Sequence, residues 1–361
     1  MINEKVLRIG TDDNNIYYLD DENGYWRKAL TLFDGYNDAN KIANNIGIKN
    51  AEIHFFIDGI NKLKDKGFLL VLDKKFTNEK WFERYRSNIF YFNSDKINGI
   101  DFQNKLNKIS VLIIGVGGGG FTILSHLVSL GVENITVIDF DKVDLSNISR
   151  QVLWGEKEVS RDKIDVAEDY FLNKNSKGRI RKLKCNIESV SDIQKYVNDV
   201  DWVFSCADDP PYKMQRIVNK ACYIANKPVL FSFCQKNNGR YFFMDPAKSG
   251  CVDCLFVGTV DEKWYNFILA LKNSNFVPQT SATSYTISLL CSIIIQKWII
   301  LLQDGKFNNW ITRLDFDTLS FTKVTEWYKQ KNCPTCGDNN ITDNNLLSFF
   351  KLMGNIENND N

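Results

Sequence analysis

The chain has 361 residues, a formal net charge of +1 and 25% charged side chains. Its length exceeds one ordinary domain of ~150 residues, and its balanced charge provides no strong field for a polyanion. We therefore expect neither a nucleic-acid partner nor a membrane surface. The N-terminus lacks the basic and apolar sections of a signal peptide, which predicts a cytoplasmic protein.

Residues 1–73 predict a small winged-helix module. The segments "VLRIG" and "IYYLDD" flank a turn-rich "TDDNN" and indicate a hairpin. Two amphipathic stretches follow, and the second ends at Gly67 before a strand-like "FLLVL". The alternative is a helical extension that only packs on the main domain. Residues 74–101 then form a charged, aromatic connector that contains "WFERYRSNIFYF".

From residue 102 to about residue 337 the pattern alternates between strand and helix. It begins with "ISVLIIGVG", continues through "NITVIDFD", "RIRKLKCNI" and "VDWVFSCADD", and reaches "KPVLFSFC". This alternation predicts the α/β class, with a doubly wound, Rossmann-like parallel sheet. "GRYFFMDP" and "RLDFDTLSFTKVTEW" predict later antiparallel strands on either side of a long apolar segment.

That apolar segment, residues 286–302, is the one candidate membrane span in the sequence. Gln296 and Lys297 interrupt it, and its apolar core is short for the ~20 residues that a bilayer requires, so we predict a buried helix. Residues 338–361 form an Asn-rich polar tail with room for one helix at residues 344–353.

A glycine-rich turn, "GVGGGG", follows the first strand of the alternating region. Gly115, Gly117 and Gly120 satisfy the G-x-G-x-x-G pattern between a strand and a helix, where backbone amides and a helix N-terminus face a phosphate. Asp139 ends the next strand, ~20 residues further on, where a carboxylate can accept hydrogen bonds from ribose hydroxyls. These features alone fit NAD, FAD or ATP.

The residues after Asp139 favour a triphosphate. Asn147, Arg150, Gln151 and Lys163 supply two cations and two amides, more than a dinucleotide pyrophosphate needs. A triphosphate that is cleaved does need them, because negative charge develops on the leaving pyrophosphate. A solvated helix with incidental cations is the alternative.

"FSCADDP" ends a strand at the carboxyl edge of the predicted sheet, where such sheets bind ligands. Asp208 is placed to hold Mg²⁺ against phosphates, since this ion prefers one or two carboxylates plus phosphate oxygens. Asp209 is expected instead to cap the helix that begins near Pro210.

Two cysteine pairs predict a structural zinc site. Cys251 and Cys254 form one C-x-x-C knuckle, and Cys333 and Cys336 form the second. Four thiolates in two knuckles suit a closed tetrahedral Zn²⁺ site, whereas a thioredoxin-like redox role is the alternative. The remaining cysteines, among them Cys206, Cys234 and Cys291, are expected to pack in the core.

Taken together, "GVGGGG", "DFD", "LSNISRQ", "RDK" and "CADD" resemble, in order and spacing, the ThiF/MoeB/HesA adenylating superfamily, which includes the ubiquitin-activating enzymes. The resemblance covers nearly the whole chain and is strongest to the MccB-like peptide-adenylating branch. It implies that ATP lies against the glycines, with Asp139 on the ribose. The nucleotide-contacting residues that it implies are Gly115, Gly117, Gly118, Gly120, Asp139, Asp141, Asn147 and Gln151. The catalytic residues that it implies are Arg150, Lys163, Asp208 (on Mg²⁺) and Arg86.

Arg86 lies in the connector, residues 74–101. Relatives place an arginine there that reaches the ATP of the partner subunit, so the resemblance implies a homodimer. In "ERYRSN" Arg84 and Tyr85 fit that pattern, but Arg86 stands one position early, and Ser87 occupies the expected place. Either Arg86 or Arg84 could therefore act across the interface, and a surface cation is the alternative. Residues 1–73 also resemble the PqqD-like modules that bind a precursor peptide at a hairpin edge.

The function implied by the resemblance is ATP-dependent adenylation of a ribosomally made precursor peptide in natural-product or antibiotic biosynthesis. A carboxylate or amide would be activated on the α-phosphate and pyrophosphate released. The product could be a stable adenylate, a phosphoramidate or a peptide cyclised through glutamate. Adenylation of a ubiquitin-like sulfur carrier is a rival, which the lack of a cysteine between Leu255 and Leu290 disfavours. A non-catalytic peptide-presenting partner and an NAD oxidoreductase are more distant rivals.

Overall fold

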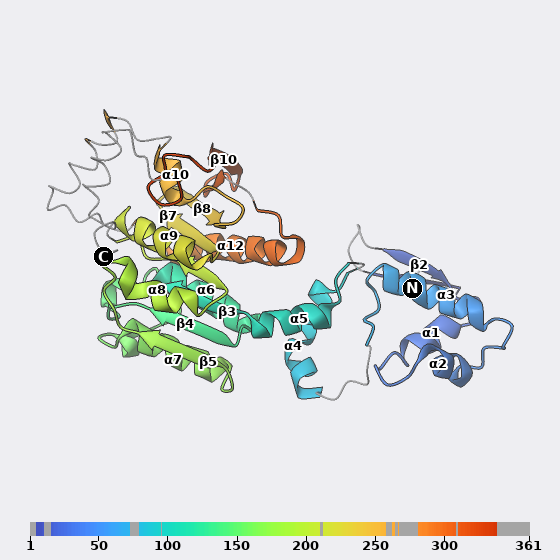
Figure 1. Ribbon diagram of the computed structural model, residues 1–361. Helices are drawn as coiled ribbons and strands as arrows, with labels where there is room; N and C mark the ends of the chain where they lie inside the picture. The colour runs from blue at the N-terminus through green and yellow to red at the C-terminus, as the bar shows by residue number, and fades with distance from the viewer. Residues whose placement is uncertain are drawn as a thin grey trace. The chain divides into compact units, whose positions relative to one another are not determined.

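The computed structural model describes residues 5–10, 16–72, 79–94, 96–209, 212–257, 262–263, 266, 281–307 and 310–337. The chain divides into two compact units, Met1–Leu106 and Asn107–Asn361. Their boundary falls within helix α5 (Gly99–Lys108), as can be followed in Figure 1. The four-part division expected, with boundaries at residues 73, 101 and 337, stays a prediction, and the polar tail lies outside the described residues.

The first unit opens with an antiparallel hairpin. Strand β1 (Val6–Ile9) pairs with β2 (Tyr17–Asp20), as the sequence predicts, with Val6 opposite Asp20. In the described part of this unit four helices precede α5: α1 (Tyr25–Leu30), α2 (Ala39–Asn45), α3 (Ile53–Asp65) and α4 (Glu79–Phe92). Two small cores hold the hairpin and the first three helices, one between α1, α2 and α3 and one where Leu63 of α3 meets the hairpin.

The strand expected at "FLLVL" does not form. Gly67, at φ +75°, ends α3 as predicted, but residues 68–72 run without strand pairing. Side-chain amides satisfy their carbonyl groups instead: Asn93 Nδ2 donates to the carbonyls of Gly67 and Leu69, at 3.0 and 3.4 Å, and Asn98 Nδ2 donates to that of Val71. Side-chain amides thus take the place of a pairing strand for two carbonyl groups of this segment.

The second unit is built on an eight-stranded sheet in the order β10-β9-β8-β7-β6-β3-β4-β5. The parallel strands are β3 (Ser110–Ile114), β4 (Asn134–Ile138), β5 (Arg179–Leu183), β6 (Trp202–Ser205) and β7 (Val229–Cys234). The antiparallel strands are β8 (Asn238–Met244), β9 (Trp310–Asp315) and β10 (Phe321–Glu326). The chain order reverses between β3 and β6, the point at which a doubly wound sheet opens a crevice.

Helices cover both faces of this sheet. Helices α8 (Val190–Asn198) and α9 (Lys213–Ala225) pack on the face that includes Leu112 and Ile114 of β3. Helices α6 (Gly118–Ser129), α7 (Lys163–Lys174) and α12 (Ser284–Asp304) cover the opposite face. The short elements are η1 (Leu145–Asn147), η2 (Glu156–Glu158) and α10 (Val252–Val257). The prediction of a doubly wound α/β domain is confirmed.

Helix α12 is the apolar segment singled out in the sequence. Among the described helices it alone is long and apolar enough to cross a membrane by length and composition. It packs against α6, β7 and β8 and buries Ile287, Leu290, Ile294 and Trp298. This packing accounts for its apolar face.

Candidate active site

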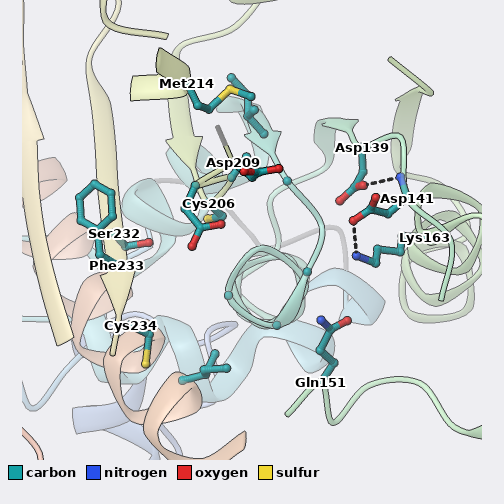
Figure 2. Close-up of a pocket in the computed structure, with 18 of the residues that line it drawn as sticks. Asp139, Asp141, Gln151, Lys163, Cys206, Asp209, Met214, Ser232, Phe233 and Cys234 are labelled. Carbon is teal, nitrogen blue, oxygen red and sulfur yellow. Dashed lines mark hydrogen bonds and ion pairs between the residues drawn. The ribbon is translucent and has the colours of Figure 1, made fainter. Parts of the chain in front are cut away.

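A cavity of about 330 Å³ lies at the carboxyl ends of β3, β4, β6 and β7. Figure 2 views it along α6, with Asp139, Asp141 and Lys163 on one side and Ser232, Phe233 and Cys234 on the other. Its lining includes nine of the residues implied by the resemblance: Gly115, Gly117, Gly118, Asp139, Asp141, Arg150, Gln151, Lys163 and Asp208. Asn147, Gly120 and Arg86 are not among the lining residues.

The glycine turn leads directly from β3 into α6. Gly115 adopts φ +83°, and a Cβ there would lie 2.7 Å from the Ala207 backbone nitrogen. The first amides of α6 follow Gly117, which has no side chain to cap them. These amides have no acceptor within the helix and can therefore bind an anion in the cavity.

Gly120 serves packing rather than the cavity. A Cβ on it would lie 1.8 Å from the carbonyl oxygen of Gly115, so only glycine lets α6 approach the turn this closely. Gly119 differs, because the nearest atom to a Cβ there is Cys291 Sγ, at 4.0 Å. The four glycines of the run thus meet different requirements.

Asp139, Asp141 and Lys163 form one hydrogen-bonded group. The Asp139 carboxylate accepts the backbone N–H groups of Val116 and Asp141, at 2.6 and 2.8 Å. Lys163, the buried first residue of α7, donates from Nζ to Asp141 Oδ2 at 2.8 Å (Figure 2). Burial raises the pKa of Asp139, and the Lys163 charge opposes that rise. The group fixes β3, β4 and α7 around the cavity.

The loop after β4 presents Arg150 and Gln151 to the cavity. Asn147 accepts hydrogen bonds from both of their backbone N–H groups, at 3.0 and 2.9 Å, through its own carbonyl. The Asn147 side chain is turned back on the loop and accepts from the Asp144 N–H. Asn147 therefore shapes this loop from outside the cavity. Gln151 lines the cavity and is buried, and its Oε1 has no hydrogen-bond partner among the described residues, so this acceptor is unused in the structure.

Asp208 and Asp209 follow β6 on the cavity wall. Protein surrounds the Asp208 carboxyl although solvent reaches it, and this desolvation raises its pKa, with Asp209 adding to the rise. Asp209 does not cap the next helix, which corrects the sequence-based expectation. Helix α9 begins at Lys213 with Tyr212 at its N-cap and no side-chain cap, so both carboxylates are left to the cavity.

Sequence reasoning missed several lining residues on the β7 side. Ser232 and Phe233 lie near the carboxyl end of β7, which is parallel to β6, so the rule that located Asp208 could have found them. Cys206, Cys234 and Cys291, expected to serve core packing alone, also line the cavity. Burial raises the pKa of Cys206 to about 12, so this thiol is not a ready nucleophile.

Arg86 lies in the other unit, on α4. It is exposed and forms an ion pair with Glu83 at 3.4 Å. Arg84 lies beside the ring of Tyr85, 5.3 Å from the ring centroid. A role for either arginine across a subunit interface stays a prediction.

The two C-x-x-C knuckles meet in the second unit. The four sulfur atoms of Cys251, Cys254, Cys333 and Cys336 all lie within 4.8 Å of one another and are buried. The Sγ–Sγ distances are 3.4 Å from Cys251 to Cys333 and 3.2 Å from Cys254 to Cys336. Zinc with Zn–S bonds of about 2.3 Å holds sulfur atoms about 3.8 Å apart in a tetrahedron. The donor set and spacing therefore fit a structural zinc.

Buried polar contacts tie the knuckles to α9. Asp253, inside the first knuckle, accepts from Arg216 Nε at 2.9 Å and from Thr335 Oγ1, inside the second knuckle, at 2.6 Å. Asn219 Oδ1 accepts the Val252 N–H at 2.8 Å. Helix α9 also carries Met214 into the cavity wall. One helix thus contacts both the cysteine cluster and the cavity.

The sequence model of the ThiF family matches residues 92–335. The adenylyltransferase and sulfurtransferase MOCS3 of Culex quinquefasciatus is 27% identical over 241 residues, which cover 67% of this chain and 53% of that protein. The sulfur carrier protein ThiS adenylyltransferase of Escherichia coli K12 is 26% identical over 265 residues, which cover 73% and 98%. The chain spans about half or less of the length of its MOCS3 relatives.

Solved structures extend the likeness to most of the chain. E. coli MccB crystallised with ATP has a TM-score of 0.67 at 22% identity, covering 93% of this chain and 98% of that one. A crystal structure of PaaA has a TM-score of 0.68 at 18% identity, covering 91% and 100%. At these identities the likeness shows the fold.

Proposed function

The chain belongs to the ThiF family, and from that premise we propose that it is an ATP-dependent adenylyltransferase acting on a precursor peptide. The observation that carries the proposal is the cavity itself. The open N-terminus of α6, the Asp139 carboxylate, the unpaired Gln151 Oε1 and the cations Arg150 and Lys163 converge on one space. This set matches the phosphates, ribose hydroxyls and developing charge of a cleaved triphosphate.

In the proposed reaction a substrate carboxylate or amide oxygen attacks the α-phosphorus of ATP. A phosphorus–oxygen bond to the substrate forms while the bond to pyrophosphate breaks, and negative charge leaves with the pyrophosphate. Arg150 and Lys163 stabilise that charge, and the amides of α6 orient the phosphates. Lys163 reaches the phosphates by turning from Asp141, its partner in the structure.

Two metal ions belong to the proposal. Asp208 would hold Mg²⁺, which neutralises phosphate charge, and its exposed carboxylate on the cavity wall suits an ion bound through one carboxylate and phosphate oxygens. Cys251, Cys254, Cys333 and Cys336 would hold a structural zinc. Asp208→Asn should abolish Mg-ATP-dependent turnover while the fold and the zinc content stay unchanged. Full activity in that variant would refute the Mg²⁺ role.

The peptide substrate rests on two supports. The likeness to MccB extends through the N-terminal unit, and one MccB structure contains N-formylated MccA. That unit has a hairpin with an exposed Tyr18, to which an extended peptide could add. We propose a homodimer in which Arg86 or Arg84 contributes to the partner's site.

Adenylation of a sulfur carrier protein is the second candidate, because relatives at similar identity bear that activity in their names. The lack of cysteine between Leu255 and Leu290 argues against a thiol-dependent transfer from such a carrier. Glutamate-activating cyclisation and a non-catalytic, peptide-presenting role are further outcomes of the test.

Calorimetric titrations with Mg-ATP and with NADH come first, and we expect ATP alone to bind. Incubation with Mg-ATP and either a precursor peptide or a carrier ending in Gly-Gly, followed by intact mass spectrometry, then identifies the substrate. Added AMP on the peptide supports the proposal, and loss of water indicates cyclisation. Added AMP on the carrier alone supports the second candidate. NADH binding without ATP binding would overturn both.

A further inference from the structure

Two arginines stand directly opposite each other on β8 and β9. Arg240 pairs in register with Arg313, and Phe233 of β7, which lines the cavity, pairs with Arg240 on its other side. All three lie on the face that carries Phe242 and Ile311, because side chains two residues apart on a strand share a face. A row of side chains thus leads from the cavity wall toward the sheet edge.

Few described protein groups pair with these two arginines, although water reaches the Arg313 side chain, which is 39% exposed. No described residue forms a hydrogen bond or ion pair with Arg240, and its buried Nε has no partner. Arg313 Nε is also without a partner, and its only ion pair among described residues is with Asp315, at 3.5 Å. Like charges directly opposite each other on neighbouring strands are destabilising.

Asp315 cannot neutralise the pair. Its Oδ1 accepts the N–H groups of Asp317 and Thr318 and the Thr318 hydroxyl, so the turn after β9 uses that oxygen. These hydrogen bonds, that from the Thr318 N–H foremost, lower the pKa of Asp315. Only Oδ2 faces Arg313. The Arg240 charge acts on Tyr212, whose pKa burial raises and Arg240 lowers, but no described carboxylate forms an ion pair with Arg240.

A third unpaired group lies on the same face. Asn238 precedes Arg240 by two residues on β8, and its buried Oδ1 has no hydrogen-bond partner. The face therefore offers two unused donors and one unused acceptor. A peptide can satisfy both kinds, since a carboxylate accepts bidentate hydrogen bonds from arginine and a backbone N–H donates to an amide oxygen.

We propose that Arg240 and Arg313 bind a carboxylate of the substrate peptide while another of its groups reacts in the cavity. This deepens the proposed function and rests on it for the substrate class. Neighbouring strands lie about 4.8 Å apart, and an extended peptide spans about 3.4 Å per residue. The bound carboxylate would therefore lie roughly two or three residues from the part of the peptide at Phe233.

The test uses the full chain labelled with ¹⁵N-arginine and follows the Nε–H signals of Arg240 and Arg313, assigned with Arg240→Gln and Arg313→Gln. Three probes are titrated: Ac-Gly-Glu-Gly-NH₂, Ac-Gly-Gln-Gly-NH₂ and Ac-Gly-Gln-Gly with a free C-terminus. We expect saturable shifts with a carboxylate probe and none with the neutral one. The side-chain and terminal carboxylates are distinguished by which probe binds. Absent shifts, or equal shifts with the neutral probe, would overturn the proposal.

The affinities of the peptide probes for the arginine variants provide a quantitative test. Each arginine substitution should weaken the binding of the carboxylate probe by about tenfold or more, because a hydrogen bond to a charged group is lost. Arg181→Gln on β5, where Arg181 pairs with Asp199, is the matched control and should leave the affinity unchanged. Stronger binding of sodium pyrophosphate than of either carboxylate probe would reassign the pair to the nucleotide and contradict the proposal.

A measurement without any ligand separates binding from structure. If the arginines are reserved for a ligand, Arg240→Gln should leave Tm unchanged or raise it, because a repulsion is removed. A Tm lowered by several degrees would assign Arg240 a structural role instead. None of these readouts requires turnover. A chain that binds the probes but does not adenylate peptides would contradict the proposed function alone.

Discussion

The two sides of the cavity compensate their charges in opposite ways. On the β3–β4–α7 side, Lys163 is paired with Asp141, and Asp139 accepts two backbone N–H groups. On the side that continues from β7 to β9, no described residue forms a hydrogen bond or ion pair with Arg240. Paired charges hold elements in place before a ligand arrives. Arg240, which is half-buried with its Nε enclosed, has no such partner among the described residues. The protein itself thus pairs the charges of the first side, whereas we propose that a ligand carboxylate pairs those of the second.

The largest expected effect on the β3–β4–α7 side of the cavity is that of Gly120→Ala on stability. A Cβ would lie 1.8 Å from the Gly115 carbonyl oxygen, so the turn or α6 must move. We expect a loss of about 3 kcal/mol or more in the free energy of unfolding, measured by urea titration. Gly119→Ala is the control, since its Cβ meets only Cys291 Sγ at 4.0 Å, and it should be neutral or stabilising. Equal stability of the two variants would contradict the packing role.

Lys163→Ala removes the cation of the first side. Turnover with Mg-ATP should fall about 10²- to 10³-fold, as when one preorganised charge-stabilising group is lost. Loss of the ion pair should cost at most about 1 kcal/mol of stability, because the Asp141 side chain is 47% exposed and water can solvate it. Lys182→Ala on β5, which removes ion pairs with Asp165 and Glu168, is the control. Turnover that survives in Lys163→Ala would show that the pair with Asp141 is structural only.

On the second side, adding a Cβ to a glycine should destabilise the protein less. A Cβ at Gly239 would meet the Leu290 methyl groups, at 2.7 and 2.9 Å, rather than backbone. The end of a leucine side chain can shift, so Gly239→Ala should cost about 1 kcal/mol in the same urea titration, at the lower end of overpacking effects. A loss as large as that of Gly120→Ala would show that both sides are equally rigid.

The smallest expected effect concerns pH. Burial raises the pKa of Asp139 above 3.8 in the folded chain, so the folded state binds the proton more tightly than the unfolded state. Its contribution to stability is therefore full below that value and is lost as pH rises through the raised pKa. The difference in unfolding free energy between Asp139→Asn and wild type should grow in favour of the variant from pH 4 upward. A flat difference would place Asp139 in a solvated environment.

The first side could be read from the sequence because its residues occur in short motifs at strand ends. Gly115, Asp139 and Asp208 each follow the end of a parallel strand, and such ends meet at one edge of the sheet. The second side could not be read this way. Arg240 and Arg313 lie far apart in the chain, and only the register of β8 and β9 makes them neighbours.

Two local expectations failed for similar reasons. The "FLLVL" segment does not pair as a strand, and Asn93 and Asn98, from beyond the local segment, donate to the carbonyl groups of Leu69 and Val71. Asp209 is not a cap because α9 begins later than the proline suggests, at Lys213. Local propensity locates elements well but does not anticipate partners supplied from elsewhere in the chain.

The cysteine cluster has a consequence for the second side as well. Cys251 and Cys333 are 82 residues apart, and α12, β9 and β10 all lie within the loop that they close. A metal bound there would remove about 4 kcal/mol of loop-closure entropy from the unfolded chain. It would also keep β9 tethered near β8 when their ladder opens. The arginine pair depends on the register of β8 and β9. With the loop closed by the metal, these strands would pair again from nearby positions, without first diffusing together as the ends of a long flexible chain.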